Sequence, residues 1–280
     1  METGSTSVRA VLIDIDGVLT VSWRALPGAV AALREIRAAG LGVALVTNTT
    51  SRTRASIATA LGEASFAAGA EDVLTAPAVT AKHLAEHFPG ARCALLNSGD
   101  VREDLEGVRL VDENDENDEN DANDENDENT SPDVVVVGGA GPEFGYAALN
   151  RVFGHLQRGA RLVAMHRNLF WRTDRGLQLD TGAFLLGLER AARTEAVVTG
   201  KPSPAFFAAA LARLGVGADR TLMVGDDIES DVLAAQRAGI SGVLVRTGKY
   251  LPESLAAASG TPDHVLDSFA DLPALLGLRG

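Results

Sequence analysis

Apolar, strand-like segments that end in paired acidic residues recur near both ends of this 280-residue chain, and they limit its fold more than any other feature. Val8–Ile13 leads into Asp14 and Asp16, and Thr221–Val224 leads into the acidic turn at 225–227. Apolar segments of this kind, interrupted in the first case only by Arg9, are typical of strands buried on both faces of a parallel sheet. Because the carboxyl ends of such strands meet at one edge, we expect the two acidic pairs to share a crevice.

Segments with helical spacing alternate with these strands, which is the pattern of an α/β sheet. Helices are expected from Pro27 to Gly40 and from Ser51, as the N-cap, to about Leu61. The alternation returns late in the chain, with strands at 197–199, 221–224 and 242–245 and helices at 204–215 and 231–238. The chain therefore predicts a Rossmann-like, doubly wound parallel sheet.

The middle of the chain carries strands of its own. Apolar runs at Cys93–Leu96, Val134–Val137 and Leu162–Met165 are the expected strands. We predict that residues 1–79 and 183–280 form a core domain, and that residues 80–182 form a second α/β domain inserted into it.

Asp14 and Asp16 lie two residues apart, so in an extended strand their side chains point to the same side. Two carboxylates held this close repel each other, and burial is unfavourable unless they share a proton or bind a cation. Oxygen ligands at the end of a strand suit a hard cation such as Mg²⁺. The same residues also fit a simple turn, in which Asp and Gly are common.

Other polar residues are expected at the same edge of the sheet. They are Asp226, Asp227 and Asp231 after one strand, Lys201 between a strand and a helix, and Thr47-Asn48 after another strand. A lysine, a hydroxyl and an amide beside helix N–H groups are suited to bind phosphate near these acids. Taken singly, the same residues fit an acidic helix N-terminus, an exposed lysine and ordinary helix caps.

Together these residues resemble, in order, the four motifs of the haloacid dehalogenase (HAD) superfamily of phosphohydrolases. The matching segments are Asp14-x-Asp16-Gly17-Val18-Leu19-Thr20, Thr47-Asn48, Gly200-Lys201-Pro202 and Gly225-Asp226-Asp227-x-x-x-Asp231. An insertion between the Thr-Asn and Lys motifs is similar to that of subclass IIA, which carries a C2 cap. The resemblance spans most of the chain and implies a Mg²⁺-dependent phosphatase of small phosphorylated molecules.

The resemblance also implies a role for each matching residue. Asp14 would be the nucleophile that forms an aspartyl phosphate, and Asp16 would be the general acid and base. Mg²⁺ would be held by Asp14, the backbone carbonyl of Asp16, and Asp226. Lys201 would neutralise the negative charge of the nucleophile and the phosphate, and Thr47 and Asn48 would hold phosphoryl oxygens. Asp231 would orient these side chains without touching the substrate.

Two other functions fit parts of the sequence. His83, Glu86 and His87 match the H-x-x-E-H pattern of zinc peptidases, although a solvated helix face is the more ordinary explanation and a peptidase would leave the four phosphatase motifs unexplained. A binding module without catalysis is the other alternative, which the presence of both Asp14 and Asp16 disfavours.

Other motifs in the chain do not indicate a nucleotide site. Gly248-Lys249 is followed by a tyrosine, and not by the serine or threonine of a P-loop. In the inserted domain, His166, Arg167 and Trp171 fit substrate recognition or a structural role.

Eleven acidic residues in the DEN repeat at 112–129 account for all but two units of the net charge of −13. The rest of the chain is nearly neutral, so nucleic acid is not an expected partner. The triplet period matches neither helix nor strand, and we predict a dispensable loop on the cap.

No apolar run is long enough for a membrane span, and a single cysteine, Cys93, suits the cytoplasm. A homodimer formed through the cap is a further expectation.

Overall fold

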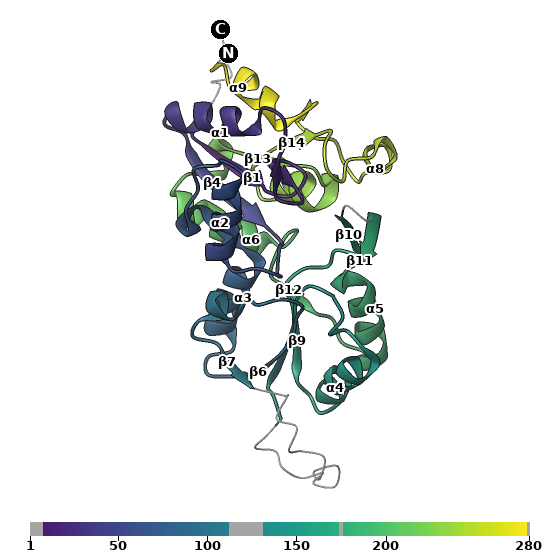
Figure 1. Cartoon of the computed structure of the whole chain (residues 1–280). Helices are drawn as coiled ribbons and strands as arrows, with labels where there is room; N and C mark the ends of the chain where they lie inside the picture. The colour runs from purple at the N-terminus through teal and green to yellow at the C-terminus, as the bar shows by residue number, and fades with distance from the viewer. Residues whose placement is uncertain (1–7, 112–130, 174–175, 279–280) are drawn as a thin grey trace.

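The computed structural model describes residues 8–111, 131–173 and 176–278, so the acidic repeat at 112–129 lies outside the described residues. Two parallel sheets dominate the molecule, one in each of two domains (Figure 1). The mixed α/β class and the parallel sheets predicted from the sequence are confirmed. No helix among the described residues is long and apolar enough to cross a membrane.

The core domain is built on a six-stranded sheet with the order β15-β14-β13-β1-β4-β5. Its strands are β1 (Ala10–Asp14), β4 (Gly42–Thr47), β5 (Val73–Thr75), β13 (Thr221–Gly225), β14 (Ser241–Val245) and β15 (His264–Leu266). Helices α1 (Ala29–Ala38), α2 (Arg54–Glu63) and α9 (Leu272–Leu275) cover one face, and α6 (Pro204–Leu214) and α7 (Ala234–Arg237) cover the other. The short helix α8 (Pro252–Ala256) follows β14, and the small β2 (Thr20–Val21) and β3 (Arg24–Ala25) ribbon follows β1.

Strand β1 is central because both of its faces are apolar. Val11 and Ile13 pack with the first group of helices, whereas Leu12 packs with Phe206 and Phe207 of α6 on the other side. All five of these side chains are fully buried. The period of two in a strand therefore directs alternate residues into two separate cores, which holds the end of β1 at a fixed position in the sheet.

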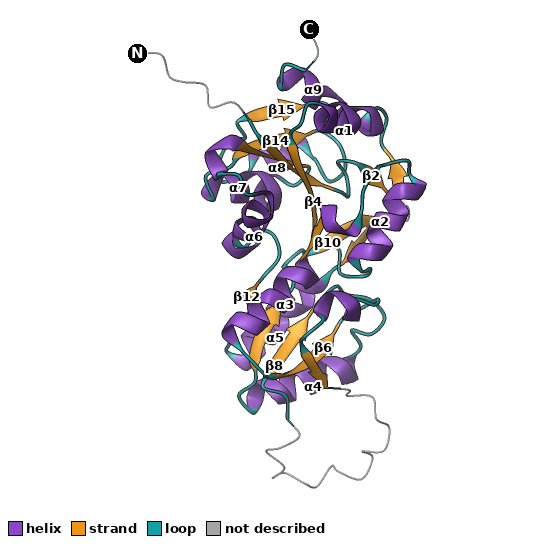
Figure 2. Cartoon of the chain, turned by 90° about the vertical axis from the view of Figure 1, so that its left-hand side faces the viewer, coloured by secondary structure: helices purple, strands orange, loops and turns teal. Residues whose placement is uncertain are grey.

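The second domain has a five-stranded parallel sheet with the order β12-β9-β8-β6-β7 (Figure 2). Its strands are β6 (Arg92–Leu96), β7 (Arg109–Val111), β8 (Val134–Val137), β9 (Arg161–Ala164) and β12 (Val197–Val198). Helices α4 (Tyr146–Gln157) and α5 (Thr181–Ala192) pack on one face, and α3 (Ala76–His87) and the short helix η2 (Arg102–Leu105) pack on the other. We call this domain the cap.

Strand β12 differs from its predicted place, because Val197 and Val198 pair with β9 in the cap and not with the core sheet. Helix α5 also belongs to the cap, where Leu185 and Leu188 join the apolar cluster on β8. The predicted second boundary, at residues 182 and 183, falls inside this helix. We therefore propose that the chain returns to the core near Thr199.

The two connections between the domains lie side by side. The hydroxyl groups of Thr80 in α3 and Thr199 after β12 are buried and 2.7 Å apart. A second link joins Asp104 of η2 to the start of α2, where its carboxylate accepts hydrogen bonds from the backbone N–H and the guanidinium of Arg54, each at 2.9 Å. The first turn of a core helix is thus bound by a cap residue.

Helix starts differ slightly from the sequence-based expectation. Thr53, and not Ser51, caps α2 by accepting a hydrogen bond from the backbone N–H of Ser56. After β13, the chain first forms a wide π-helical turn, η5 (Ile228–Leu233), before α7 begins. Wide turns of this kind are frequent at functional sites.

Candidate active site

Asp14 and Asp16 lie at the carboxyl end of β1, at the centre of the core sheet's edge. Asp14 is buried, and its strand neighbours are β4 and β13. Gly17 then turns the chain with φ of +87°, a conformation that strongly favours glycine. The ends of the two strands that flank β1 therefore supply the next residues of the site.

Lys201 provides the positive charge at the centre of the acidic group. Its Nζ lies 2.5 Å from Asp14 Oδ1 and 2.6 Å from Asp231 Oδ1, and all three side chains are buried. Although burial opposes the charge, the two carboxylates raise the pKa of Lys201 above its ordinary value. The ammonium is therefore charged, and it ties the end of β1 to the turn after β13.

Asn48 holds the loop that carries Lys201. Its side-chain amide donates to the carbonyl of Lys201 and accepts from the backbone N–H of Lys201, both at 2.9 Å. Thr47 is hydrogen-bonded to Thr49, whose hydroxyl donates to Asp16 Oδ2 at 3.1 Å. The side chains predicted to hold phosphoryl oxygens are thus engaged in supporting Lys201 and Asp16, and we propose this positioning as their main role.

Asp226 is held by the loop that follows β14. The backbone N–H of Lys249 donates to Asp226 Oδ2 at 2.7 Å. A Cβ atom on Gly17 or Gly248 would lie 1.9 or 2.0 Å from the same oxygen, so only glycine allows this approach. The packing leaves Asp226 Oδ1 without a hydrogen-bond donor among the described residues and directs one fixed carboxylate toward Asp14.

Asp231 projects from the wide turn η5 back toward the strand ends. Its Oδ1 contacts Lys201, and its Oδ2 accepts a hydrogen bond from the backbone N–H of Asp227 at 3.2 Å. Asp227 itself caps the turn by accepting from the N–H groups of Glu229 and Ser230. Because Asp231 forms an ion pair with Lys201 through Oδ1 and its other oxygen is held by the turn's own backbone, its geometry suits a residue that positions Lys201.

The carboxyl groups hold their protons more tightly than free aspartates do. Burial raises the pKa of both Asp14 and Asp16. Burial raises the pKa of Asp226 well above its usual range, and the negative charges of Asp14 and Asp231 add to this rise. Burial also raises the pKa of Asp231 to about 6, although Lys201 opposes the rise. The charges of Lys201 and Lys249 oppose the rise, but the buried carboxylates outnumber these two ammonium groups, so the site lacks positive charge.

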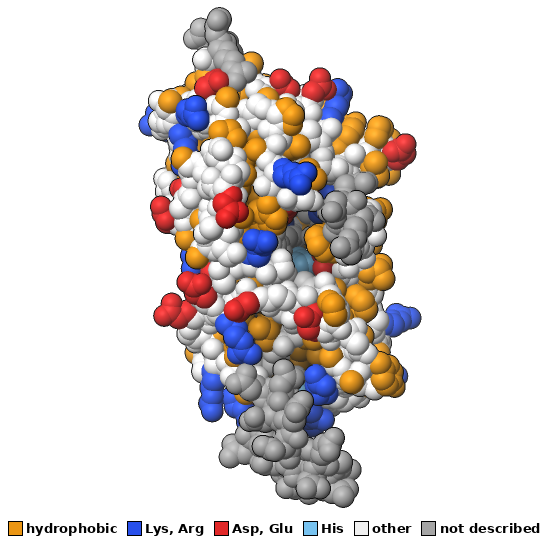
Figure 3. Space-filling model, viewed as in Figure 1, with side chains coloured by type: hydrophobic (Ala, Val, Ile, Leu, Met, Phe, Trp, Pro, Cys, Tyr) orange, Lys and Arg blue, Asp and Glu red, His pale blue; other side chains and the backbone are white. Residues whose placement is uncertain are grey.

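A cavity of about 600 Å³ opens above these residues, between the core and the cap. Figure 3 shows the hollow on this face, with a histidine side chain inside it. The hairpin of β10 (Phe170–Thr173) and β11 (Gly176–Leu179) contributes Trp171 and Gln178 to the wall. Trp23, with the guanidinium of Arg52 4.9 Å from its ring centroid, lies on the core side.

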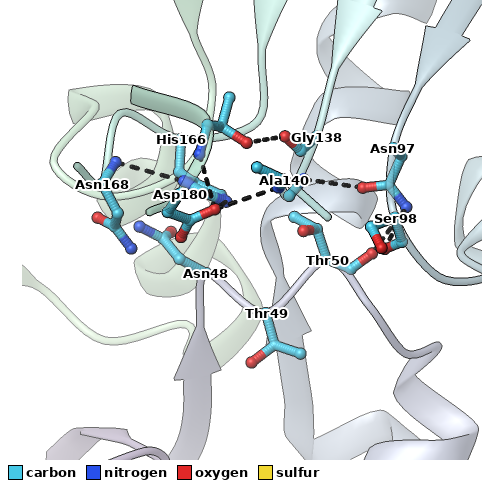
Figure 4. A network of polar contacts seen from close by, with 12 residues as sticks. Asn48, Thr49, Thr50, Asn97, Ser98, Gly138, Ala140, His166, Asn168 and Asp180 are labelled. Atoms are coloured by element: carbon cyan, nitrogen blue, oxygen red, sulfur yellow. Dashed lines mark hydrogen bonds and ion pairs between the residues drawn. The ribbon is translucent and has the colours of Figure 1, made fainter. Parts of the chain in front are cut away.

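His166 and Asp180 form the polar wall of the cap (Figure 4). Both are buried, with His166 Nε2 3.9 Å from Asp180 Oδ1. His166 Nδ1 accepts a hydrogen bond from the backbone N–H of Asn168, and Asp180 accepts from the N–H of Ala140. Burial lowers the pKa of His166; Asp180 opposes this change and Lys249 adds to it. The imidazole is therefore neutral.

Cap and core are also joined by hydrogen bonds at the edge of this network. Asn97, at the end of β6, donates to the backbone carbonyl of Thr50 at 2.9 Å and accepts from the N–H of Gly139 at 2.9 Å (Figure 4). The segment Thr49–Thr50 thus contacts Asp16 on one side and the cap on the other. The cap wall is fixed relative to Asp16 by these contacts.

In the described part of the chain, a single cluster of side chains could hold a metal ion. It consists of Asp14, Asp226 and Asp231, whose oxygens lie within 4.8 Å of one another. His83 and His87 instead stack on α3 with ring centroids 4.2 Å apart, and Glu86 lies 3.8 Å from Lys82. These helix residues do not line the cavity. The geometry therefore favours the aspartate group over the zinc alternative.

Sequence reasoning missed several residues that the fold brings to the site. Thr49 and Lys249 line the cavity, as do Arg52 and Trp23. One signal was available for Lys249, because β14 neighbours β13 and its carboxyl end must lie at the same edge. The loop after β14 was therefore a predictable part of the crevice.

The fold and site define a class of enzyme: a doubly wound core with carboxylates at its strand ends, closed by an inserted α/β cap, is a HAD-like phosphatase. The chain belongs to the haloacid dehalogenase-like hydrolase family, which it matches over residues 11–110, with a HAD-hydrolase-like match at residues 198–272.

Similar proteins cover nearly the whole chain. It is 35% identical to haloacid dehalogenase-like hydrolase domain-containing protein 2 of Bos taurus, covering 94% of this chain and 93% of that protein. It is 34% identical to the phospholysine phosphohistidine inorganic pyrophosphate phosphatase of Xenopus laevis, covering 96% and 95%. The glycerol phosphate phosphatase of Mycobacterium tuberculosis, solved in complex with magnesium, has a TM-score of 0.81 at 28% identity, covering 96% and 77%.

Proposed function

We propose that this phosphatase is Mg²⁺-dependent and hydrolyses small phosphorylated molecules through an aspartyl phosphate on Asp14. The observation that carries the proposal is the contact of the Lys201 ammonium with Asp14 and Asp231, beside the fixed carboxylate of Asp226. A buried nucleophile with one oxygen bound to lysine has a defined orientation for attack on phosphorus.

The residues present fit a magnesium ion. Asp14 Oδ2 and Asp226 Oδ1 have no hydrogen-bond donor among the described residues, whereas Asp231 faces the Lys201 ammonium through Oδ1 and accepts the backbone N–H of Asp227 through Oδ2. We therefore propose that Asp14, Asp226 and the backbone carbonyl of Asp16 hold Mg²⁺, and that Asp231 positions Lys201. Bound Mg²⁺ would supply the positive charge that lets an anionic nucleophile approach an anionic phosphate.

The chain's own residues then account for the two half-reactions. Asp14 forms a bond to phosphorus while the bond to the leaving oxygen breaks, and Asp16 transfers its proton to that oxygen. Water then forms a bond to phosphorus while the bond from phosphorus to Asp14 breaks, and Asp16 takes the proton that this water loses. Asp16 suits this role because burial raises its pKa, against the opposing hydrogen bond from Thr49 and the charges of Lys249, Lys201 and Arg52.

The substitution Asp16→Ala tests the proposed acid. We expect it to slow hydrolysis of an alkyl phosphate by roughly 10² to 10⁴-fold, because an alkoxide leaves poorly without a proton. Hydrolysis of p-nitrophenyl phosphate should fall much less, since nitrophenolate is a stable anion. The measurement is kcat for both substrates in wild type and variant. Equal losses would leave Asp16 only a geometric role, and absence of phosphate release by the wild type would refute the proposed function.

Magnesium should stabilise the protein more at pH 7.5 than at pH 5. Because the folded-state pKa values of the aspartates are raised, their protonated forms favour folding at low pH. For Asp231, this stabilisation is complete below pH 3.8 and is lost as the pH rises through about 6. Metal binding needs the deprotonated forms, so Mg²⁺ at a hundred times Kd should raise the melting temperature by roughly 5–10 °C at pH 7.5.

Two control variants accompany this measurement. The shift caused by Mg²⁺ should vanish in Asp226→Asn and persist in His83→Ala, because only the first removes a proposed ligand. A shift that survives in Asp226→Asn, or one produced by Zn²⁺ and abolished by His83→Ala, would contradict the proposed magnesium site. The homodimer through the cap and the cytoplasmic location stay predictions from the sequence.

A further inference from the structure

The loop after β4 carries the hydroxyl group that contacts the proposed general acid. Thr49 donates a hydrogen bond to Asp16 Oδ2 at 3.1 Å, and its own backbone N–H is bound to Thr47 Oγ1 at 3.0 Å. A protonated carboxyl group accepts at one oxygen and donates from the other. Because Thr49 donates to Oδ2, the proton that Asp16 transfers belongs on Oδ1, and its direction depends on where Thr49 lies.

Asn97 holds this loop from the cap. Its side-chain amide donates to the backbone carbonyls of Thr50, at 2.9 Å, and Gly99, at 3.0 Å. Its oxygen accepts from the N–H of Gly139 at 2.9 Å (Figure 4). One side chain therefore joins the core loop to the ends of two cap strands, β6 and β8. The Thr50 carbonyl belongs to the residue next to Thr49, so a shift of this peptide also moves the hydroxyl group of Thr49.

Two glycines of the cap allow it to approach the loop this closely. Gly99 has a φ of +88°, and a Cβ atom there would lie 2.5 Å from the backbone oxygen of Ser51. A Cβ atom on Gly139 would overlap the hydroxyl group of Thr50, which is buried. The loop therefore has no room to move toward the cap, and the Asn97 amide prevents it from moving away.

We propose that Asn97 is a positioning residue for the general acid: by holding the Thr50 carbonyl it fixes the Thr49 hydroxyl, and through it the carboxyl group of Asp16. The cap thus contributes to proton transfer even for a substrate whose leaving group does not touch it. This inference rests on the proposed function, because Asp16 is the acid of that reaction. Asn97 itself touches neither the substrate nor the reacting atoms.

The experiment uses two variants of Asn97. Asn97→Asp keeps the shape of the side chain and the bond from Gly139 but removes the donor to Thr50, and Asn97→Ala removes both bonds. We expect each variant to lower kcat for ethyl phosphate about tenfold more than kcat for p-nitrophenyl phosphate, because only the alkoxide needs a well-directed proton. KM should change by less than about twofold, since binding of the substrate is untouched. Equal losses of kcat for both substrates would contradict the proposal.

A double variant tests the route through Thr49. Thr49→Val removes the hydroxyl group, keeps the shape of the side chain and should show the same selective loss. Adding Asn97→Ala to Thr49→Val should reduce the ratio of the two kcat values no further, because the effect of Asn97 passes through Thr49. Losses that multiply in the double variant would show that Asn97 acts by another route and would overturn the inference.

A control variant separates this effect from a general loosening between cap and core. Thr80→Val removes the buried hydrogen bond between the hydroxyl groups of Thr80 and Thr199, at the two connections, without touching the loop that carries Thr49. It should leave the ratio of the two kcat values unchanged. A selective loss as large as that of the Asn97 variants would refute a specific role for Asn97.

Hydrogen exchange keeps this inference separate from the proposed function. In the substrate-free protein, both Asn97 variants should speed exchange of the Thr49 amide about tenfold, as measured by NMR, whereas Thr80→Val should not. Unchanged exchange at Thr49 in the Asn97 variants would refute the positioning role. Faster exchange, combined with equal losses on both substrates in Asp16→Ala, would refute the acid role of Asp16 and leave the fixing of the loop by Asn97 in place.

Discussion

Replacing Asp14 by asparagine should abolish turnover while leaving the protein folded. An amide has nearly the same shape as the carboxylate but cannot attack phosphorus, and loss of a covalent nucleophile lowers kcat by about 10⁴-fold or more. Lys201 keeps its contact with Asp231 in this variant, so its charge remains paired. Steady-state release of phosphate measures the effect, and the melting temperature confirms the fold.

Acid quenching gives the same prediction a second readout. During turnover of a labelled substrate, the wild type should carry phosphate on Asp14 in a form that hydroxylamine removes, because acyl phosphates react with this nucleophile. Asp14→Asn should carry none. Activity of the variant within tenfold of the wild type, or an equal amount of trapped phosphate in both proteins, would exclude Asp14 as the nucleophile.

Replacing Lys201 by methionine should damage both stability and activity. The ammonium is buried between Asp14 and Asp231, and removing one partner of a buried ion pair costs about 3–5 kcal/mol of unfolding free energy. The remaining carboxyl groups can relieve this penalty by taking up protons, so the destabilisation should be smaller at pH 5 than at pH 7.5. Chemical denaturation at the two pH values measures the difference.

A double substitution separates the two effects of Lys201. Lys201→Met combined with Asp231→Asn removes the ammonium together with one carboxylate, so it should recover a large part of the lost stability. It should not recover turnover, because no positive charge then faces Asp14. Additive losses of stability in the double variant would show that Lys201 and Asp231 do not interact as the contact distance of 2.6 Å requires.

Much of the fold was predictable because buried parallel strands leave a strong local pattern. Val8–Ile13 could only be an interior strand, and the acids that follow it had to lie at the edge where neighbouring strands end. The sheet to which β12 belongs was not predictable in this way. Val197–Val198 is short, and its pairing with β9 depends on tertiary packing that two apolar residues do not encode.

The approximate place of the site could be predicted, but the detailed contacts could not. The spacing of Asp14 and Asp16 indicates a shared site, whereas the engagement of the Asn48 amide by the backbone of Lys201 depends on two loops 153 residues apart. The sequence around Lys249 does not fit a P-loop, so no motif predicts its place in the site. That place follows from Gly17 and Gly248, whose lack of side chains lets the two loops touch at Asp226.

The adjacent connections at the start of α3 and at Thr199 define where this enzyme could be cut and rejoined. Since the hydroxyl groups of Thr80 and Thr199 are 2.7 Å apart, a foreign cap needs only two closely spaced ends, one joined just before α3 begins at Ala76 and one near Thr199. A chimera joined there would keep β12 with the sheet it belongs to, whereas a junction at residue 183 would divide α5 between two parents. The downstream junction also leaves Gly200 and Lys201 with the host, so a foreign cap could be placed over the proposed catalytic residues without moving them.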